Sequence, residues 1–367
     1  MTSVGGSTHG RVGAVVLAFG EEPLLQRCVH ALLGSRGVDV RVVVVDNGSR
    51  GAVDAVRDLP RVEVLTPGTN LGFAGGCNLG ASALPADRDT LVLVNSDAVV
   101  RPDALAALHE TLTDPTVGIA TGSLRLMAQP ETVNSVGNPV HFSGISWAGG
   151  LGEHADQHAV AGPVTSASGA ILGTRVETWR ELGGFWEPMF AYCEDLELSL
   201  RSWQRGGSVV YVPTAVAEHD YRFHRNATKM YLVERNRLAV LATLYEWRTL
   251  VVLGPALVAL ELALLALSVR QGWWRDKLRG YGWLVRHAGD IRRRRRWVAG
   301  QRTVRDRDLL GLFTDRIEPG EQSGMSAPAL LNSLSAAYWH SARRLLGRAP
   351  RVEAPAPHAG NVVPVRA

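Results

Sequence analysis

Acidic side chains stand at three points of this 367-residue chain where β-branched or aromatic runs end. Asp46 follows a run of valines, Asp97 ends the segment Asn95-Ser96-Asp97 after Leu91–Val94, and Glu194 and Asp195 follow an aromatic stretch. Carboxylates can hold hard divalent cations or serve as general bases. These positions are therefore the first candidates for chemistry.

Asp97 is the candidate metal ligand. A carboxylate at the end of a buried strand faces the crevice where parallel sheets bind ligands, and it suits Mg²⁺ or Mn²⁺ bridging a diphosphate. His219 can complete such a site as a neutral imidazole. The competing interpretations are that Asn95 or Asp97 caps a helix beginning near Pro102, and that His219 is an ordinary packing or surface residue.

Glu194 and Asp195 are the candidate acid–base pair. They open the amphipathic segment Leu196–Trp203, and neighbours on a helix differ by about 100° in direction, so the two carboxylates should have different roles. A helix N-terminus favours the ionised form that a general base needs. The alternative is an ordinary acidic first turn.

Asp46 and a glycine-dense segment are the candidate nucleotide contacts. Asp46 opens the turn Asp-Asn-Gly-Ser, where it can accept hydrogen bonds from a ligand or simply initiate the turn. Asn70–Asn78 is rich in glycine, which permits close backbone approach, and a helix starting there would favour a phosphate. The segment matches neither the dinucleotide fingerprint nor the P-loop.

A cluster of basic residues follows His219. It could neutralise a leaving diphosphate, or it could be a solvated loop. Its members are Arg222, His224, Arg225 and Lys229.

Alternating strand and helix patterns predict the frame that positions these residues. The short β-branched runs predict a parallel sheet with helices on both faces, that is, an α/β fold. Loops and short strands are expected from about 122 to 163. The expected strands are Val12–Ala18, Val40–Val45, Val62–Leu65, Leu91–Val94 and Ser208–Val212, and the expected helices are Thr174–Leu182, Asp195–Arg205 and Ala227–Trp247.

The composition, with 46% hydrophobic and 20% charged residues, is globular and excludes a disordered or fibrous protein. Three widely spaced cysteines, Cys28, Cys77 and Cys193, predict neither a disulfide framework nor a zinc site. The N-terminal stretch lacks the apolar core of a signal peptide or anchor. We therefore expect a reducing, cytoplasmic location.

The segment Thr249–Val269 is apolar apart from Glu261, and a basic segment follows it. From Arg270 to Asp308 the chain has 13 Lys or Arg and 4 Asp or Glu. The apolar segment is long enough to span a bilayer, but one span would separate the arginines from the N-terminal domain, against the positive-inside rule. The open interpretations are a helix in the membrane plane, a helix buried in a bundle, and a true span.

In order along the chain, several motifs resemble the inverting family 2 glycosyltransferases, specifically the bacterial rhamnosyltransferase-like branch. The ordered set covers roughly residues 11–240. The segments are Val44–Ser49, Asn70–Gly80, Leu93–Asp97, Ser168–Arg175, Leu182–Arg201, His219 and Glu234–Asn236.

The resemblance implies a GT-A fold that binds a nucleotide-diphosphate sugar. Asp195 would be the general base, with Glu194 as the competing candidate, and Asp97 would hold the metal, with His219 as a second ligand. Asp46 would contact the nucleoside. The remaining nucleotide-sugar contacts implied are Phe19, Asn70, Gly72, Phe73, Asn78, Asn95, Ser96 and Gly169.

Two positions depart from the family pattern. Phe19-Gly20 replaces a Tyr-Asn pair, and Glu197 replaces an aspartate of the family's acidic signature while preserving the carboxylate. The processive Gln-x-x-Arg-Trp signature is absent, which favours transfer of one or a few sugars.

We therefore predict a metal-dependent inverting glycosyltransferase. It would work on a lipid-linked or glycan acceptor at the anionic inner face of the cytoplasmic membrane, with no nucleic-acid partner. The predicted parts are a flexible lead (1–10), a GT-A domain (11–240), a helical membrane-associated region (241–345) and a disordered tail (346–367). The rival hypotheses are a nucleotidyl- or sugar-phosphate-handling enzyme and a nucleic-acid- or membrane-binding adaptor with an inactive first domain.

Overall fold

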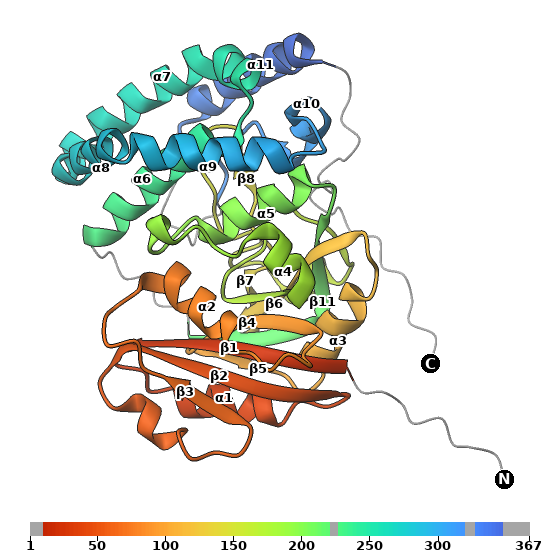
Figure 1. Cartoon of the computed structure of the whole chain (residues 1–367). Coiled ribbons are helices and arrows are strands. Elements are labelled where there is room, and N and C mark those ends of the chain that lie inside the picture. The colour runs from red at the N-terminus through yellow and green to blue at the C-terminus, as the bar shows by residue number, and fades with distance from the viewer. Residues whose placement is uncertain (1–9, 221–226, 320–326, 348–367) are drawn as a thin grey trace.

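The computed structural model describes residues 10–220, 227–319 and 327–347. Its centre is a mixed β-sheet with the strand order β3-β2-β1-β4-β10-β6-β11-β5, to which β7 and β9 add at β6 and β11. Helices cover both faces of this sheet, and a further layer of helices lies beyond one of them (Figure 1). The strands are β1 (Gly10–Gly20), β2 (Val38–Ser49), β3 (Val62–Leu65), β4 (Thr90–Asn95), β5 (Ala98–Val100), β6 (Val117–Leu126), β7 (Gln129–Ser135), β9 (Gly162–Pro163), β10 (Ile171–Arg175) and β11 (Ser208–His219).

The first four strands of the predicted sheet are confirmed as parallel neighbours. β1 pairs with β2 on one side and β4 on the other, and β2 pairs with β3, all in parallel. Successive side chains of a strand point to opposite faces, so Ala14 and Val16 enter one core while Val15 and Leu17 enter the other. Burial on both faces explains why these strands read as continuous valine runs.

The second half of the sheet differs from the prediction. β10 is antiparallel to both β4 and β6, and β5 is antiparallel to β11, so the sheet is mixed rather than all parallel. β11 also continues through the expected loop to His219, because a register irregularity between Val212 and Val216 accommodates Pro213. The predicted helix from Thr174 is likewise the end of β10 followed by a shorter helix.

Five helices pack directly on the sheet. α1 and α3 contribute leucines to the core on one face, whereas α2, α4 and α5 contribute to the core on the other. Their bounds are α1 (Leu25–Leu33), α2 (Gly72–Ser82), α3 (Ala104–Leu112), α4 (Val176–Leu182) and α5 (Glu194–Gln204).

The C-terminal helices form a layer of their own, in which α7 and α11 lie farthest from the sheet (Figure 1). A third core joins this layer to α5 and to a small parallel pair of strands, β8 (Val140–His141) and β12 (Phe313–Thr314). The predicted helix through Trp247 is two helices, since α6 ends at Leu244, so the predicted boundary at 240 falls inside α6. The helices are α6 (Ala227–Leu244), α7 (Trp247–Gln271), α8 (Trp274–Arg286), α9 (Ala288–Gln301), α10 (Asp306–Leu309) and α11 (Ala329–Leu346).

Candidate active site

The carboxyl ends of β1, β2 and β4 meet at one edge of the sheet. In the strand register Ala18 lies opposite Asp46 and Leu17 lies opposite Asn95. Phe19, Asp46 and the segment from Asn95 to Asp97 are therefore neighbours, which is where parallel sheets bind ligands.

Asp46 has the turn role that the sequence left open. Its Oδ1 accepts hydrogen bonds from the backbone N–H groups of Gly48 (3.3 Å) and Ser49 (2.8 Å). The exposed ring of Phe19 lies beside this turn, since a Cβ at Gly48 would sit 3.7 Å from it. An apolar ring next to a fixed carboxylate can flank a nucleoside.

Asn47 was missed by the sequence analysis, although it joins two of the predicted segments. It is buried, and its Nδ2 donates to Asn70 Oδ1 (2.9 Å) and to the carbonyl of Gly72 (3.2 Å). Its Oδ1 accepts from the N–H of Leu71 at 2.7 Å. Asn47 thus fixes the glycine-dense segment to the end of β2, and only its place in the turn that follows the valine run could have signalled this.

Three backbone N–H groups at the start of α2 have partners within the protein. The N–H of Leu71 goes to Asn47, that of Gly72 to Asn70 Oδ1 (2.8 Å), and that of Ala74 to the carbonyl of Phe190 (3.0 Å). Gly72 has a φ of +71°, and a Cβ there would lie 2.4 Å from the Phe190 carbonyl oxygen. The glycine therefore permits the close approach of a protein loop.

Asn78 makes a similar protein contact. Its amide donates to the Phe185 carbonyl (2.9 Å) and Glu187 Oε1 (3.1 Å), and its oxygen accepts from the N–H of Phe185 (2.9 Å). In the described structure this side chain holds residues 185–187 against α2.

Asp195 lies at the predicted position in the first turn of α5 and is half-buried. Its Oδ2 accepts from the N–H of Gly169 (3.0 Å) and its Oδ1 from the N–H of Leu196 (2.7 Å). A Cβ at Gly169 would lie 3.6 Å from the Phe73 ring and 3.5 Å from Asp195 Oδ2. Phe73, Gly169 and Asp195, which are far apart in sequence, are thus brought together.

The two adjacent carboxyls differ in environment. Burial raises the pKa of Asp195, but the hydrogen bonds from Gly169 and Leu196 act against that rise. Glu194 is buried, and its Oε2 has no hydrogen-bond partner among the described residues. Burial and then the charge of Asp195 raise the pKa of Glu194 well above its ordinary value. The pKa of both carboxyls is thus raised, and hydrogen bonds from other residues favour the ionised form only at Asp195.

A strained loop precedes this pair. Phe190, Tyr192 and Cys193 all have φ between 65° and 70°, a region that non-glycine residues seldom adopt. The side-chain amide of the fully buried Asn236 in α6 lies 2.7–2.9 Å from the carbonyls of Met189, Ala191 and Tyr192.

Arg235 adds hydrogen bonds to the same loop, to the carbonyls of Pro188 (3.1 Å) and Met189 (2.6 Å). The sequence analysis gave the segment Glu234–Asn236 only as a motif of the family resemblance, without a role. In the structure it braces the loop that leads into Glu194 and Asp195.

Asp97 and His219 meet although 122 positions separate them. His219 Nε2 lies 3.1 Å from Asp97 Oδ1, and its Nδ1 lies 2.8 Å from Asn134 Oδ1. An imidazole that donates Nδ1–H to an amide oxygen presents the Nε2 lone pair that a metal needs. The described residues hold no group of three or more His, Cys, Asp or Glu that could bind a metal.

The predicted metal ligand and the predicted base are linked by one segment. The N–H of Asn95 donates to the carbonyl of Ala170 at 3.1 Å, and the neighbouring N–H of Gly169 donates to Asp195. Ser96, which is buried, hydrogen-bonds the carboxyl of Glu22, a residue whose pKa burial raises. The geometry therefore joins the end of β4 to the start of α5.

Of the basic cluster that follows His219, only Lys229 lies within the described residues. Arg222, His224 and Arg225 lie outside the described residues. Lys229 belongs to α6, and its Nζ lies 5.6 Å from the centre of the Tyr192 ring.

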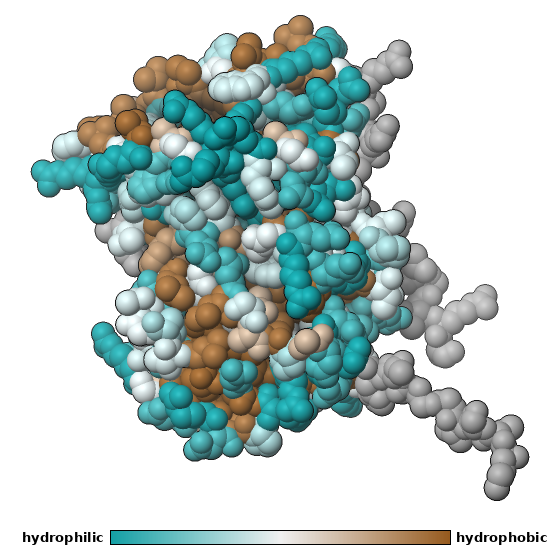
Figure 2. All heavy atoms as spheres, viewed as in Figure 1, coloured by the Kyte–Doolittle hydropathy of each residue, from teal (hydrophilic) through white to brown (hydrophobic). Residues whose placement is uncertain are grey.

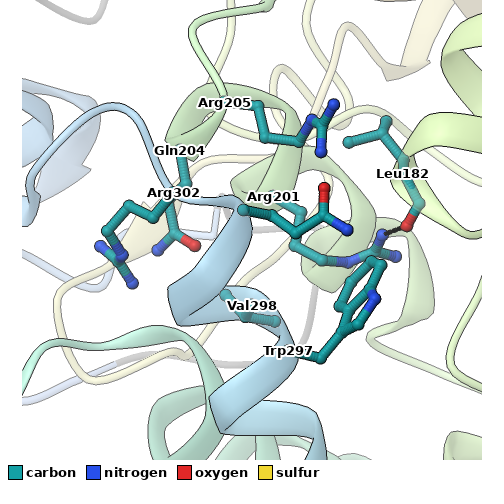
Figure 3. A pocket seen from close by; sticks show the side chains of 8 residues that line it. Leu182, Arg201, Gln204, Arg205, Trp297, Val298 and Arg302 are labelled. Atoms are coloured by element: carbon teal, nitrogen blue, oxygen red, sulfur yellow. Dashed lines mark hydrogen bonds between the residues drawn. The ribbon is translucent and has the colours of Figure 1, made fainter.

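Glu197, the substituted acidic position, is a structural residue. It is fully buried and pairs with Arg201 (2.6 Å) and Arg294 (2.8 Å). Burial would raise its pKa, but the two guanidinium groups hold it below the ordinary value. A small pocket between α5 and α9 lies beside Arg201, which donates to the carbonyl of Leu182 (Figure 3). Part of the arginine-rich segment is thus used for packing α9 onto α5.

The sequence matches a known family over most of the part that builds this site. The profile of the glycosyltransferase-like family 2 matches residues 9–239. The chain belongs to this family.

Individual proteins of known name are similar to this chain at low sequence identity. A pre-mycofactocin glycosyltransferase of Mycobacterium tuberculosis is 28% identical over 221 residues, which are 59% of this chain and 44% of that protein. An N-acetylglucosaminyl-diphospho-decaprenol L-rhamnosyltransferase of the same organism is 28% identical over 239 residues, 56% of this chain and 74% of the relative. The chain thus spans less than half the length of the first relative.

The fold also has solved counterparts. The crystal structure of GalNAc-T7 with UDP, GalNAc and Mn²⁺ aligns with a TM-score of 0.55 at 17% identity, covering 65% of this chain and 49% of that chain. This likeness confirms the predicted GT-A fold. The bound UDP and Mn²⁺ belong to that protein.

Proposed function

We propose that this glycosyltransferase transfers a sugar, rhamnose or another hexose, with inversion from a nucleotide-diphosphate donor to a lipid-linked or glycan acceptor. The observation that carries the proposal is the link from Asn95 through Ala170 and Gly169 to Asp195. This link supports the proposal because it brings the Asp195 carboxylate close to the strand end that leads to Asp97.

Asp195 is the general base of the proposed reaction. Its half-buried carboxylate takes the proton of an acceptor hydroxyl, and the acceptor oxygen then bonds to the anomeric carbon as the bond from that carbon to the diphosphate breaks. The backbone N–H groups of Gly169 and Leu196 orient this carboxylate. Glu194 is buried beside it, and burial together with the charge of Asp195 raises the pKa of Glu194.

Asp97 and His219 would hold a divalent cation, Mg²⁺ or Mn²⁺, on the diphosphate side. Such an ion neutralises charge that develops on the leaving diphosphate. Asp46, Phe19 and Asn70 would line the nucleoside side, while Asn47 keeps the glycine-dense segment in place.

The proposed acceptor and the proposed cellular location are supported by observations outside the active site. The relative named for a decaprenol-linked substrate points to a lipid-linked acceptor, and the exposed apolar helix α7 points to the inner face of the cytoplasmic membrane. By length and composition α7 could cross a membrane, and core helices of soluble proteins can have the same length and composition.

The test is thermal unfolding of the purified protein with UDP, dTDP and GDP, each with and without Mn²⁺. Binding to the native state raises its apparent stability by mass action. We expect a Mn²⁺-dependent shift for one nucleotide that Asp97→Ala abolishes. Asp103→Ala, which removes an exposed carboxylate at the start of α3, is the matched control and should keep the shift.

The Asp195→Asn variant completes the test. It should retain the nucleotide shift and lose sugar transfer, because the base acts on the acceptor. If no nucleotide shifts the unfolding temperature at millimolar concentration, the proposal fails and the adaptor hypothesis gains support.

A further inference from the structure

One face of α7 is an uninterrupted apolar stripe that the protein leaves uncovered. Trp247, Val251, Val258, Leu262 and Val269 are each 60–72% exposed. Their spacing of four or seven residues places them within about 60° of one another around the helix. Soluble proteins seldom expose a contiguous apolar surface of this size without a partner.

Neighbouring helices widen the stripe into a surface. α11 packs along α7, with Tyr338 donating to the carbonyl of Val252 (2.6 Å), and it exposes Leu330, Leu334 and Leu345. α8 adds the exposed Leu278 and Val285. Figure 2 shows apolar side chains gathered over α7 and α11 at the end of the molecule opposite β3.

The one charged residue inside the apolar segment does not reach this surface. Glu261 turns toward the protein, where its carboxylate pairs with Arg237 and with Lys277 (2.8 Å) and accepts from the hydroxyl of Tyr281 (2.7 Å). Lys277 is 1% exposed, and it also pairs with Glu234 of α6. The one acidic side chain of the apolar segment is therefore neutralised inside the protein.

This ion cluster also fixes the direction of α7. Glu261 holds the middle of the helix to α6 and α8, and Arg248 near its start donates to the carbonyl of Leu345 in α11 (2.7 Å). A helix held along its length cannot turn to span a bilayer without exposing buried charges. The conflict between a span and the positive-inside rule does not arise.

The border of the apolar surface suits an anionic lipid layer. Arg270, Arg275, Arg279 and Arg286 are exposed around α8 and the end of α7. Trp247 begins α7 and Trp274 begins α8, and tryptophan and arginine are favoured at the level of lipid headgroups. A second copy of the chain joined by a two-fold axis would bring much of this arginine border against itself.

We propose that the outer face of α7, α8 and α11, called here the apolar face, docks in the plane of an anionic bilayer. α7 lies at the boundary of headgroups and acyl chains, and the arginines contact the lipid phosphates. The proposal deepens the membrane location given under the proposed function, but it depends on different residues from those of the active site.

The first experiment is co-sedimentation of the full chain with vesicles of phosphatidylcholine, with and without phosphatidylglycerol. We expect binding that rises with phosphatidylglycerol and falls at least tenfold in the double variant Val258→Asp/Leu262→Asp. Val160→Asp is the matched control, because Val160 is 51% exposed but lies on the sheet domain. Arg275→Gln/Arg279→Gln should lose the preference for phosphatidylglycerol.

Spin labels separate an in-plane helix from a span. Labels at Val251→Cys, Val258→Cys and Val269→Cys should report the same shallow depth in vesicles, after subtraction of label on the native cysteines. A depth that passes through the bilayer centre along this series would overturn the proposal.

Two other results would also overturn it. One is vesicle binding that Val258→Asp/Leu262→Asp leaves unchanged. The other is a lipid-free dimer that this double variant turns into a monomer, which would assign the face to a second copy. The Mn²⁺-dependent nucleotide shift should survive in the double variant, so failure of docking and failure of the proposed transferase site are distinguishable.

Discussion

Two pairs of acidic residues in this molecule have opposite electrostatic surroundings. Glu194 and Asp195 open α5, where none of the described cations pairs with them, and burial raises the pKa of both. Glu234 and Glu261 lie in the helical layer, where Arg237 and Lys277 outweigh burial and lower the pKa of each, that of Glu261 to about 2. Similar side chains are left uncompensated at one site and neutralised at the other.

The difference in pKa indicates that one pair is suited to proton transfer and the other to stabilising the fold. A carboxylate whose pKa is raised is a better proton acceptor, and it costs stability when it ionises. A carboxylate whose pKa is lowered is inert toward protons near neutral pH and stabilises the fold that pairs it. Substitutions that remove one charge should therefore affect activity at the first pair and stability at the second.

Asp195→Asn should have the largest effect. Loss of a general base typically costs 10²- to 10⁴-fold in rate, and we expect roughly a 10³-fold fall in kcat for sugar transfer. Initial rates and the nucleotide-dependent unfolding shift should be measured on the same preparation. If Asp195→Asn keeps activity while Glu194→Gln loses it, the roles of the two carboxyls are exchanged.

Glu261→Gln should leave kcat nearly unchanged and destabilise the protein by about 2–3 kcal/mol. It leaves Arg237 and Lys277 with one buried acidic partner instead of two. The matched control is Glu21→Gln, which breaks an exposed pair with Arg50 and should cost less than about 1 kcal/mol.

The pH dependence of the Glu261→Gln effect has a definite sign. Because folding lowers the pKa of Glu261 from 4.5 to about 2, its stabilisation is complete above pH 4.5 and is lost as pH falls toward 2. Denaturant unfolding of wild type and variant should therefore converge in strong acid. A difference that stays constant down to pH 2 would contradict the ionic origin.

The sequence indicates the importance of Glu194 and Asp195 more clearly than that of Glu234 and Glu261. Glu194 and Asp195 stand out because a strand-rich chain places them at a helix start after an aromatic run. In the sequence, Glu261 is only the one charged residue of an apolar segment. Its partners Arg237 and Lys277 lie 24 and 16 positions away on other helices, and no local pattern connects them.

In the fold and the rest of the site, too, features with a local sequence pattern were predictable and features that depend on distant contacts were not. The valine runs of β1, β2 and β4 were predictable because burial on both faces leaves a local signature. Asn47 and Asn236 were not, since each acts through hydrogen bonds to backbone groups more than 20 positions away. The antiparallel β10 was also missed, because strand direction depends on the whole topology rather than on residue type.

Asn236→Ala should reduce kcat about tenfold. The substitution removes the amide that contacts three carbonyls of the strained loop 189–192, so the approach to Glu194 and Asp195 loses its brace. Asn332→Ala is a matched control, because Asn332 is also buried and hydrogen-bonds backbone groups, at Ile317 in the helical layer.

Both asparagine variants should lose stability, by about 1–3 kcal/mol from unsatisfied backbone groups. Only Asn236→Ala should slow transfer, and asparagine restored at 236 should recover it. Equal rates for the two variants would show that Asn236 is merely structural.

Glu194→Gln should have the smallest effect and the opposite sign to Glu261→Gln. Folding raises the pKa of Glu194 above 4.5, so the native state resists its ionisation, and the resulting loss of stability is absent below pH 4.5 and grows as pH rises. A neutral amide of the same shape avoids this loss. We expect the variant to gain about 1 kcal/mol at pH 8 and to match wild type near pH 4, as measured by denaturant unfolding at both values. One substitution type would then stabilise the protein at the catalytic pair and destabilise it at the ion cluster, because only the ion cluster supplies cations. A loss of stability at pH 8 in Glu194→Gln would mean that its buried carboxyl is ionised and paired in solution, and Glu194 would then be the base.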